Sequence, residues 1–415
     1  MSKPRLLMIG GWTDCIQKAV DGGFDVTYFG PTEPGFWLDA EVLARCEHVQ
    51  DVPVGQTALC LALAKRLHEE RPYVGAVSFS EYGIETSAVV GDALGIKSLS
   101  PWPTAITRDK AWTRQALDQT PGLAIPWRKV SSSDSLEEFY RDHGPDVIVK
   151  PITGAGSAQV HHLRAEEELK ELISAAPWDN GESFLAEKRI DSDSVYSVES
   201  LTIGGRHHVI AFSLEQTVGQ GNSATTYIMV PPPPPFSDAV RDELVSSALK
   251  LLDAVGLDWG IAHTELMIDT DGRAYPIESQ TRIGGGRIYQ MAERTTGFKQ
   301  IDTALTSLIS DETDVPHLPT ATSVCVMFRL LAPAGEVTGV ADPGVLENVE
   351  GAFASQIKIR SGDTLTSVTD NVDLAQHGAV WFEAPDHDTV QARIQGICTN
   401  YWVEYADGRR WHPKF

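Results

Sequence analysis

The sequence predicts a multidomain protein that combines an α/β amino-terminal region with α+β regions after it. The chain has 415 residues, which is more than a single hydrophobic core usually organises. Over about the first hundred residues, strand-like runs alternate with helical patterns, as is typical of a parallel sheet. Beyond them, strand-like runs follow one another closely, which indicates α+β structure.

The amino-terminal region, residues 1–105, is expected to form an open parallel sheet. A helical pattern at 84–94 ends at Gly95. Gly10-Gly11 lacks the spaced GxGxxG of a dinucleotide fingerprint, so we predict only a tight strand-to-helix turn there. The expected strands are short apolar runs, at residues 5–9, 25–29 and 73–79.

Two further regions are predicted at residues 106–185 and 186–315. Several prolines precede or open them and suggest a boundary or hinge, at positions 101, 103, 121 and 126. Five consecutive prolines at 231–235 are interpreted as a stiff spacer. The elements expected in these regions are strands at 146–150, 183–187, 195–203 and 207–214 and helices at 165–175 and 237–255.

Residues 316–415 are expected to form a β-rich carboxy-terminal domain. Strand-like runs dominate this part of the chain, at 323–330, 354–360 and 379–382. The chain shows no repeat period and no heptad run, so neither a solenoid nor a coiled coil is expected.

The charge of the chain argues against two classes of partner. There are 34 Lys and Arg against 57 Asp and Glu, a net charge of −23, and the excess acid is spread along the whole sequence. Nucleic acid and anionic membrane surfaces both require clustered basic residues, so neither is expected as a partner. Five scattered cysteines without CxxC indicate reduced thiols. With no secretory signal and no apolar run of about 20 residues, we expect a soluble cytoplasmic protein.

The most informative segment is the predicted hairpin at residues 263–280. Asp271-Gly272 is a strong two-residue turn signal, and it would place Glu265 directly opposite Glu278. Side chains so placed have Cβ atoms about 5 Å apart, and like charges there repel. Two such carboxylates require a cation, a shared proton or exposure to water. Mg²⁺ held together with substrate phosphates fits them, and a solvated hairpin is the alternative.

Two other segments could bind anions. Residues 279–287 place Arg282 and Arg287 around three glycines, which favours a phosphate or carboxylate site over a plain flexible loop. Residues 147–157 form a strand that ends in Lys150 and a small-residue loop, although GxxxxGK[ST] is missing. Lys110 is either a further cation of the site or a solvated surface residue.

Taken in order, six segments resemble the ATP-grasp superfamily, and specifically its L-amino-acid (dipeptide) ligase branch, which includes carnosine synthase. The resemblance covers nearly the whole chain. It implies an ATP-grasp fold with a Rossmann-like pre-ATP-grasp domain, a small lysine-bearing subdomain, a catalytic subdomain and a β-rich tail. The segments are Lys110, VIVKPITGAGS, FLAEKRI, YSVESL, GIAHTEL and PIESQTRIGGGR.

The resemblance implies a role for each matching residue. Arg282 resembles the arginine that stabilises the acyl-phosphate transition state, together with Glu278 and Lys150. The positions implied for ATP are Lys110, Lys150, Gly154, Gly156, Ser157, Glu187, Lys188, Ile190 and Asp193. Those implied for the metal are Glu265, Glu278 and Gln280. Those implied for the substrates are Glu81, His263, Gly285, Gly286 and Arg287.

Two positions depart from the family pattern. Val195 stands where relatives often carry an acid for the ribose, so Asp193 or Ser194 would have to replace it. Gln280 stands where an asparagine metal ligand is common, which leaves the number of metal ions open. The cofactors implied are ATP and Mg²⁺, with Mn²⁺ as the alternative ion.

The function implied is ATP-dependent ligation of a small-molecule carboxylate to an amine through an acyl phosphate. A biotin-carboxylase type of enzyme is the nearest alternative, because the segments RSGDTL from Arg360 and VTDN from Val368 resemble its tail. A nucleotide-binding protein that has lost catalysis is a second alternative. A nicotinamide dehydrogenase is not expected, because the sequence lacks the GxGxxG fingerprint of that class. Ligases of this superfamily are often dimers, so a homodimer is a further expectation.

Overall fold

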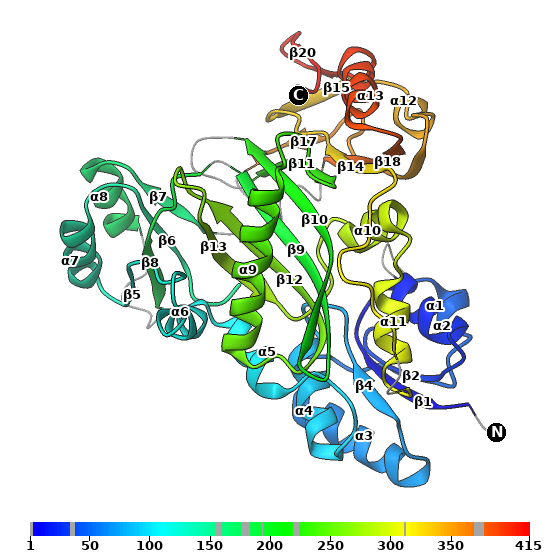
Figure 1. The fold of residues 1–415 in the computed structure, drawn as a ribbon. Helices are drawn as coiled ribbons and strands as arrows, with labels where there is room; N and C mark the ends of the chain where they lie inside the picture. The colour runs from blue at the N-terminus through cyan, green and yellow to red at the C-terminus, as the bar shows by residue number, and fades with distance from the viewer. Residues whose placement is uncertain are drawn as a thin grey trace.

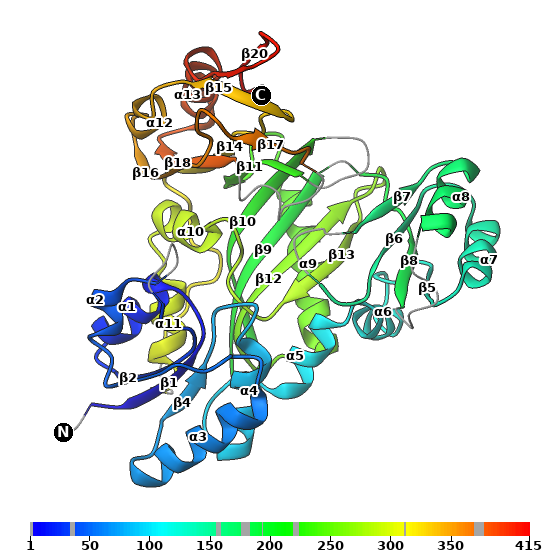
Figure 2. The same ribbon diagram turned by 180° about the vertical axis from the view of Figure 1, so that it is seen from behind.

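The computed structural model shows a mixed α/β protein in which the described residues build four β-sheets (Figures 1 and 2). One sheet is parallel and the other three are antiparallel, so the predicted combination of α/β and α+β regions is confirmed. The structure describes residues 3–33, 38–154, 159–175, 183–192, 194–218, 224–310, 313–368 and 377–415.

The amino-terminal sheet has the strand order β3-β2-β1-β4 and is parallel, as predicted. Its strands are β1 (Arg5–Ile9), β2 (Asp25–Phe29), β3 (His48–Gln50) and β4 (Gly75–Val77). The helices of this region are α1 (Thr13–Asp21), α2 (Ala40–Leu43), α3 (Thr57–Glu70) and α4 (Ile84–Leu94). Gly10 and Gly11 have φ values of +67° and +113° and form the predicted turn between β1 and α1.

The proline-rich stretch after α4 begins a pair of helices. Pro101 is the first residue of α5 (Pro101–Arg108), a position where the missing N–H costs nothing. Asp109 then caps α6 (Lys110–Asp118) by accepting from the backbone N–H groups of Ala111 and Trp112 at 2.9 and 3.0 Å. This cap places Lys110 at the start of α6.

The small sheet has the strand order β5-β8-β6-β7, and its core includes Val147, Val149, Leu136 and Phe139. Strand β6 carries Lys150 next to its carboxyl end. The strands are β5 (Trp127–Val130), β6 (Val147–Pro151), β7 (His161–Leu163) and β8 (Phe184–Lys188), and the helices are α7 (Ser133–His143) and α8 (Glu166–Ala175).

The large sheet has the order β13-β12-β9-β10-β11-β14-β18-β16. Its strands come from both sides of residue 315, where one of the predicted domain boundaries lies. The four predicted domain segments stay predictions. The strands of this sheet are β9 (Ser194–Ile203), β10 (Arg206–Val218), β11 (Ala224–Val230), β12 (Trp259–Ile268), β13 (Ala274–Gln280), β14 (Val324–Arg329), β16 (Ala352–Ile357) and β18 (Gly378–Ala384).

Helix α9 (Asp238–Val255) lies along one face of the large sheet (Figure 1). Leu244 and Ala248 of the helix pack there against Val198 and Leu266 of the sheet, all of them fully buried. The opposite face is therefore left for the polar side chains of β9, β12 and β13.

Helices α10 (Ile288–Thr296) and α11 (Gln300–Thr306) connect the large sheet to the amino-terminal sheet. Ile301 and Leu305 of α11 share a core with Leu6 of β1. Lys18 of α1 forms ion pairs with Glu293 and Asp302 at 2.9 and 2.6 Å. The amino-terminal region is thus bound to the helices that follow β13, a contact that sequence periodicity does not reveal.

The last sheet has the order β17-β15-β19-β20. Its strands are β15 (Gly335–Val340), β17 (Thr364–Leu365), β19 (Val403–Tyr405) and β20 (Arg410–Trp411), and the nearby helices are α12 (Gly344–Glu347) and α13 (His387–Asn400). Among all the described helices, none is long and apolar enough to cross a membrane.

The β12–β13 hairpin has the predicted register at the end that carries Glu265 and Glu278, but it reaches this register differently. Glu265 pairs with Glu278 and His263 with Gln280, as predicted. Nearer the turn, Ile268 pairs with Ala274, because the turn is longer by one residue and Gly272 takes a φ of +83°. A β-bulge beside Glu265 shifts the register back.

Replacing Leu244 by Ala should remove about 2–5 kcal/mol from the free energy of unfolding, because a large cavity would open between α9 and the sheet. Urea denaturation followed by circular dichroism measures the change. Lys250→Ala, on the exposed side of the same helix, should change it by less than about 0.5 kcal/mol. Equal stability of the two variants would contradict the packing described here.

Candidate active site

Polar side chains form two rows across three strands on the face opposite α9. Residues alternate between the two faces of a strand, so neighbours in register share a face. The rows are Glu199-His263-Gln280 and Ser197-Glu265-Glu278 on β9, β12 and β13. Carboxylates in both rows therefore come within reach of one another.

Glu278 is the most heavily contacted carboxylate of the second row. Its Oε2 lies 3.3 Å from Nζ of Lys110, and its Oε1 accepts from Nε2 of Gln280 at 2.5 Å. Burial raises the pKa of Glu278, but Lys110, Lys150 and Arg282 outweigh it and leave the pKa below its ordinary value. The carboxylate is therefore ionised at neutral pH.

His263 lies between two carboxylates. Its Nδ1 is 2.5 Å from Oε1 of Glu199, and its Nε2 is 3.3 Å from Oε1 of Glu265. Burial lowers the pKa of His263, but Glu199 and Glu265 outweigh it and raise the pKa to about 10. Both ring nitrogens can then donate. In the structure the His263 side chain, predicted for the substrate pocket, contacts Glu199 and Glu265.

The donor set of Glu265, Glu278 and Gln280 fits a divalent cation that is bound together with phosphates. Two carboxylates face each other on adjacent strands, and the Gln280 amide lies beside one of them. No cluster of three or more His, Cys, Asp or Glu among the described residues forms a metal site by itself. Mg²⁺ commonly takes one or two carboxylates and completes its shell with water and substrate phosphates.

A buried ion cluster lies next to this pair. Oε1 of Glu187 is 2.6 Å from Nζ of Lys150, and its Oε2 is 2.8 Å from Nε of Arg114. Nη1 of Arg114 also donates to the carbonyl of Pro276 on β13 at 2.7 Å. Burial raises the pKa of Glu187, but the two cations lower it to about 2. The predicted phosphate lysine is thus held by an ionised carboxylate.

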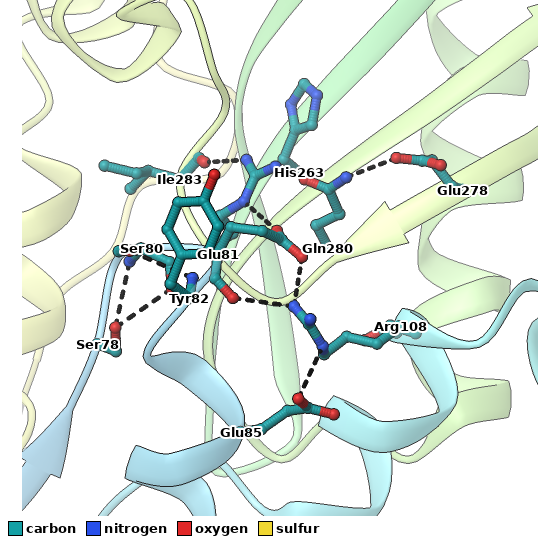
Figure 3. A network of polar contacts seen from close by, with 12 residues as sticks. Ser78, Ser80, Glu81, Tyr82, Glu85, Arg108, His263, Glu278, Gln280 and Ile283 are labelled. Carbon is teal, nitrogen blue, oxygen red and sulfur yellow. Dashed lines mark hydrogen bonds and ion pairs between the residues drawn. The ribbon is translucent and has the colours of Figure 1, made fainter. Parts of the chain in front are cut away.

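Glu81 is bound by two arginines from different parts of the chain (Figure 3). Nε of Arg282 donates to Oε2 of Glu81 at 2.7 Å, and Arg108 donates to Oε1 and to the Glu81 carbonyl. Figure 3 also shows Arg108 reaching Glu85, 3.2 Å from it. Glu81, predicted to bind a substrate amino group, is therefore paired with Arg282, predicted to stabilise the transition state.

The glycine segment after β13 lies close against the sheet. A Cβ on Gly286 would approach Ile228 to 2.9 Å. The carbonyl of Gly286 accepts a hydrogen bond from Nε1 of Trp381 at 2.8 Å. A Cβ on Gly285 would meet nothing within 4 Å. Arg287 lies over the Trp381 ring, with its Cζ 5.5 Å from the ring centre, and Nη1 donates to Gln290 at 3.1 Å.

The remaining positions predicted for ATP are only partly described. Nζ of Lys110 donates to the carbonyl of Gly154 at 3.1 Å. Nζ of Lys188 donates to two backbone carbonyls near the end of α7, so its side chain turns away from the cluster. Ile190 is buried. Gly156, Ser157 and Asp193 lie outside the described residues.

Three residues of the site were missed by the sequence reading. Arg114 lies four positions after Lys110 on α6, a spacing that already placed both on one helix face. Glu199 belongs to the YSVESL segment, and its role needed the pairing of β9 with β12. Arg108 carried no signal, because its partner Glu81 is far away in the chain.

Comparison with known proteins identifies similar sequences and folds. Residues 109–308 match the family model described as carbamoyl-phosphate synthase L chain, ATP binding domain. The chain is 25% identical over 199 residues to pyruvate carboxylase 1 of Caenorhabditis elegans, covering 46% of this chain and 17% of that protein. It is 22% identical over 260 residues to the alanine–anticapsin ligase of Bacillus subtilis, covering 57% and 54%. The matches thus span at most about half of these relatives.

Among solved structures, the chain resembles an L-amino acid ligase from Bacillus licheniformis. The TM-score is 0.80 at 18% sequence identity, and the match covers 98% of this chain and 99% of that one. At this identity the similarity shows a common fold. It extends over the whole architecture, from the parallel amino-terminal sheet to the last antiparallel sheet.

Replacing Glu187 by Gln should lower the free energy of unfolding at pH 7 by about 3–5 kcal/mol, because Lys150 and Arg114 would lose their buried partner. The pKa of Glu187 is lowered from 4.5 to about 2, so its contribution is present above pH 4.5 and is lost as the pH falls towards 2. Urea denaturation at several pH values should show the difference from wild type shrinking below pH 4.5.

Glu138→Gln is the control for that experiment. Glu138 is exposed on α7 and contacts Arg128 at 3.4 Å, so its loss should cost at most about 1 kcal/mol. A penalty for Glu187→Gln as small as this, or one independent of pH, would contradict the role given to the cluster.

Proposed function

We propose that the chain is an ATP-grasp enzyme, and specifically an ATP-dependent carboxylate–amine ligase. The match of residues 109–308 to the ATP binding domain of the carbamoyl-phosphate synthase L chain and the fold shared with an L-amino acid ligase support this proposal. One observation carries the proposal. Glu265 and Glu278 face each other on a rigid hairpin, with Lys110 3.3 Å from Glu278. A carboxylate pair and a lysine arranged in this way suit a metal-bound nucleoside triphosphate.

In the proposed reaction a substrate carboxylate attacks the γ-phosphate of ATP, and ADP leaves. The acyl phosphate is then attacked by an amine, which loses a proton as phosphate departs and the amide forms. The Mg²⁺ would neutralise charge between the phosphate oxygens. The protein's own residues mainly position the reactants and offset negative charge, which is where catalysis of phosphoryl transfer arises.

The cations of the site have separate tasks in this scheme. Lys110 and Lys150 would bind the ATP phosphates, and Arg282 would stabilise charge on the transferring phosphoryl group. In the structure Arg282 is paired with Glu81 at 2.7 Å. A substrate ammonium group that takes over Glu81 would release this guanidinium for the acyl phosphate. Arg287, whose Nη1 lies 4.0 Å from Asp14, would receive a substrate carboxylate.

Amino acids are the substrate class that we propose. Glu81 offers a carboxylate for an α-ammonium group, and Arg287 offers a guanidinium for an α-carboxylate. The similarity to an alanine–anticapsin ligase and to the fold of an L-amino acid ligase supports this choice. Magnesium and ATP are the cofactors that the proposal requires.

A carboxylase of the biotin-carboxylase type is a second candidate, favoured by the similarity to pyruvate carboxylase 1. In that reaction bicarbonate would take the place of the organic acid. ATP turnover that requires bicarbonate and biotin, and does not respond to amino acids, would select it over the ligase.

Replacing Glu278 by Ala should lower ATP turnover at least about 100-fold, because the metal-bound phosphates would lose one of two carboxylates. The assay measures phosphate release with pairs of amino acids and detects the amide product by mass. Glu347→Ala, an exposed acid on α12, is the control and should keep wild-type turnover.

The folded state of Glu278→Ala should be preserved, as judged by circular dichroism, since Glu278 contributes to no apolar core. Full turnover in this variant would remove the basis of the proposal. Screening of amino acids and small amines that gives ADP without any amide product would reject ligation and retain ATP binding.

A further inference from the structure

We propose that the buried Glu199–His263 pair positions the metal-binding carboxylate of Glu265, and that position 284 must be glycine to make room for it. The inference rests on the proposed function, because it assigns Glu265 to the metal. The inference goes beyond the proposed function because it gives Glu199, His263 and Gly284 a supporting role: they position the metal ligand Glu265 and need not contact the substrate.

The geometry forms a continuous chain of contacts across two strands. Glu199 of β9 has no exposed surface, and His263 of β12 is 5% exposed. The two are direct neighbours in register and meet at 2.5 Å. On its other side the same ring reaches Glu265 at 3.3 Å. A contact at each ring nitrogen fixes the imidazole plane, so the ring edge lies in a defined position against the carboxylate of Glu265.

Gly284 closes over this pair. A Cβ at that position would lie 2.9 Å from Nδ1 of His263 and 3.1 Å from both carboxylate oxygens of Glu199. The first distance is shorter than real Cβ contacts allow, and both neighbours are held by the sheet. The backbone of Gly284 lies outside the left-handed region, so the contact rather than the conformation selects glycine.

Metal sites commonly depend on such supporting residues. A group that hydrogen-bonds a metal ligand sets the ligand's orientation, and loss of the group typically weakens metal binding about 10- to 100-fold. Of the two facing carboxylates, Glu278 is held by Lys110 and Gln280. The Glu199–His263 pair gives Glu265 an equivalent restraint.

The test compares two glycines. Gly284→Ala places a methyl group against His263 and Glu199, whereas Gly396→Ala, on helix α13 and away from the site, adds a methyl group that meets nothing within 4 Å. Mn²⁺ binding in the presence of ADP, measured from the free-ion signal in electron paramagnetic resonance, should weaken about 10-fold or more in Gly284→Ala. In Gly396→Ala it should stay within about twofold of wild type.

A second variant keeps the test valid if Gly284→Ala does not fold. Glu199→Gln removes the charge that holds His263 but keeps the size of the side chain, and it should weaken Mn²⁺ binding in the same direction. Thermal unfolding of each variant establishes that folded protein is compared. Wild-type Mn²⁺ affinity in folded Gly284→Ala or folded Glu199→Gln would overturn the inference.

Glu278→Ala separates this inference from the proposed function. If wild type and Glu278→Ala bind Mn²⁺ with ADP equally well, the metal site itself is wrong. If Glu278→Ala loses binding while Glu199→Gln and Gly284→Ala retain it, only the positioning role fails.

Discussion

The ion cluster of Arg114, Glu187 and Lys150 joins the small sheet to the large sheet, and the site is assembled around it. Glu187 lies on β8, Arg114 on α6, and the second donor of Arg114 binds the carbonyl of Pro276 on β13. Removing such charges from water costs several kcal/mol each, so the cluster is stable only with its partners in place. It therefore fixes the position of Lys150 relative to the hairpin that carries Glu278.

A division of the large sheet into two faces explains how so many charges are tolerated nearby. The face against α9 is apolar, with Val198, Leu244 and Leu266 in contact. The other face carries acids, and each described acid of the two rows has a basic or amide neighbour. The net charge of −23 thus says little about the site, where Lys110, Lys150 and Arg282 gather against the acidic background of the chain.

Local pattern predicted much of this structure because the relevant signals are local. Strand β1, strand β2 and helix α4 begin and end where the apolar runs and Gly95 indicated. The pairing of Glu265 with Glu278 was predicted from a two-residue turn, whereas a longer turn and a bulge compensate for each other. Pro101 and Pro103 lie in the first turn of α5, a position that suits proline as well as a turn does, so the boundary or hinge suggested there stays a prediction.

The sequence by itself determined the types of element, the hairpin register at the carboxylate pair and the order of the family segments. These follow from residue alternation, turn residues and short-range spacing. Only the tertiary structure decided which groups are partners: Glu81 with Arg108 and Arg282, Glu187 with Arg114, and Glu199 with His263. The physical reason is that burial enforces charge pairing between residues far apart in the chain, 201 positions for Glu81 and Arg282, and chain order carries no record of those distances.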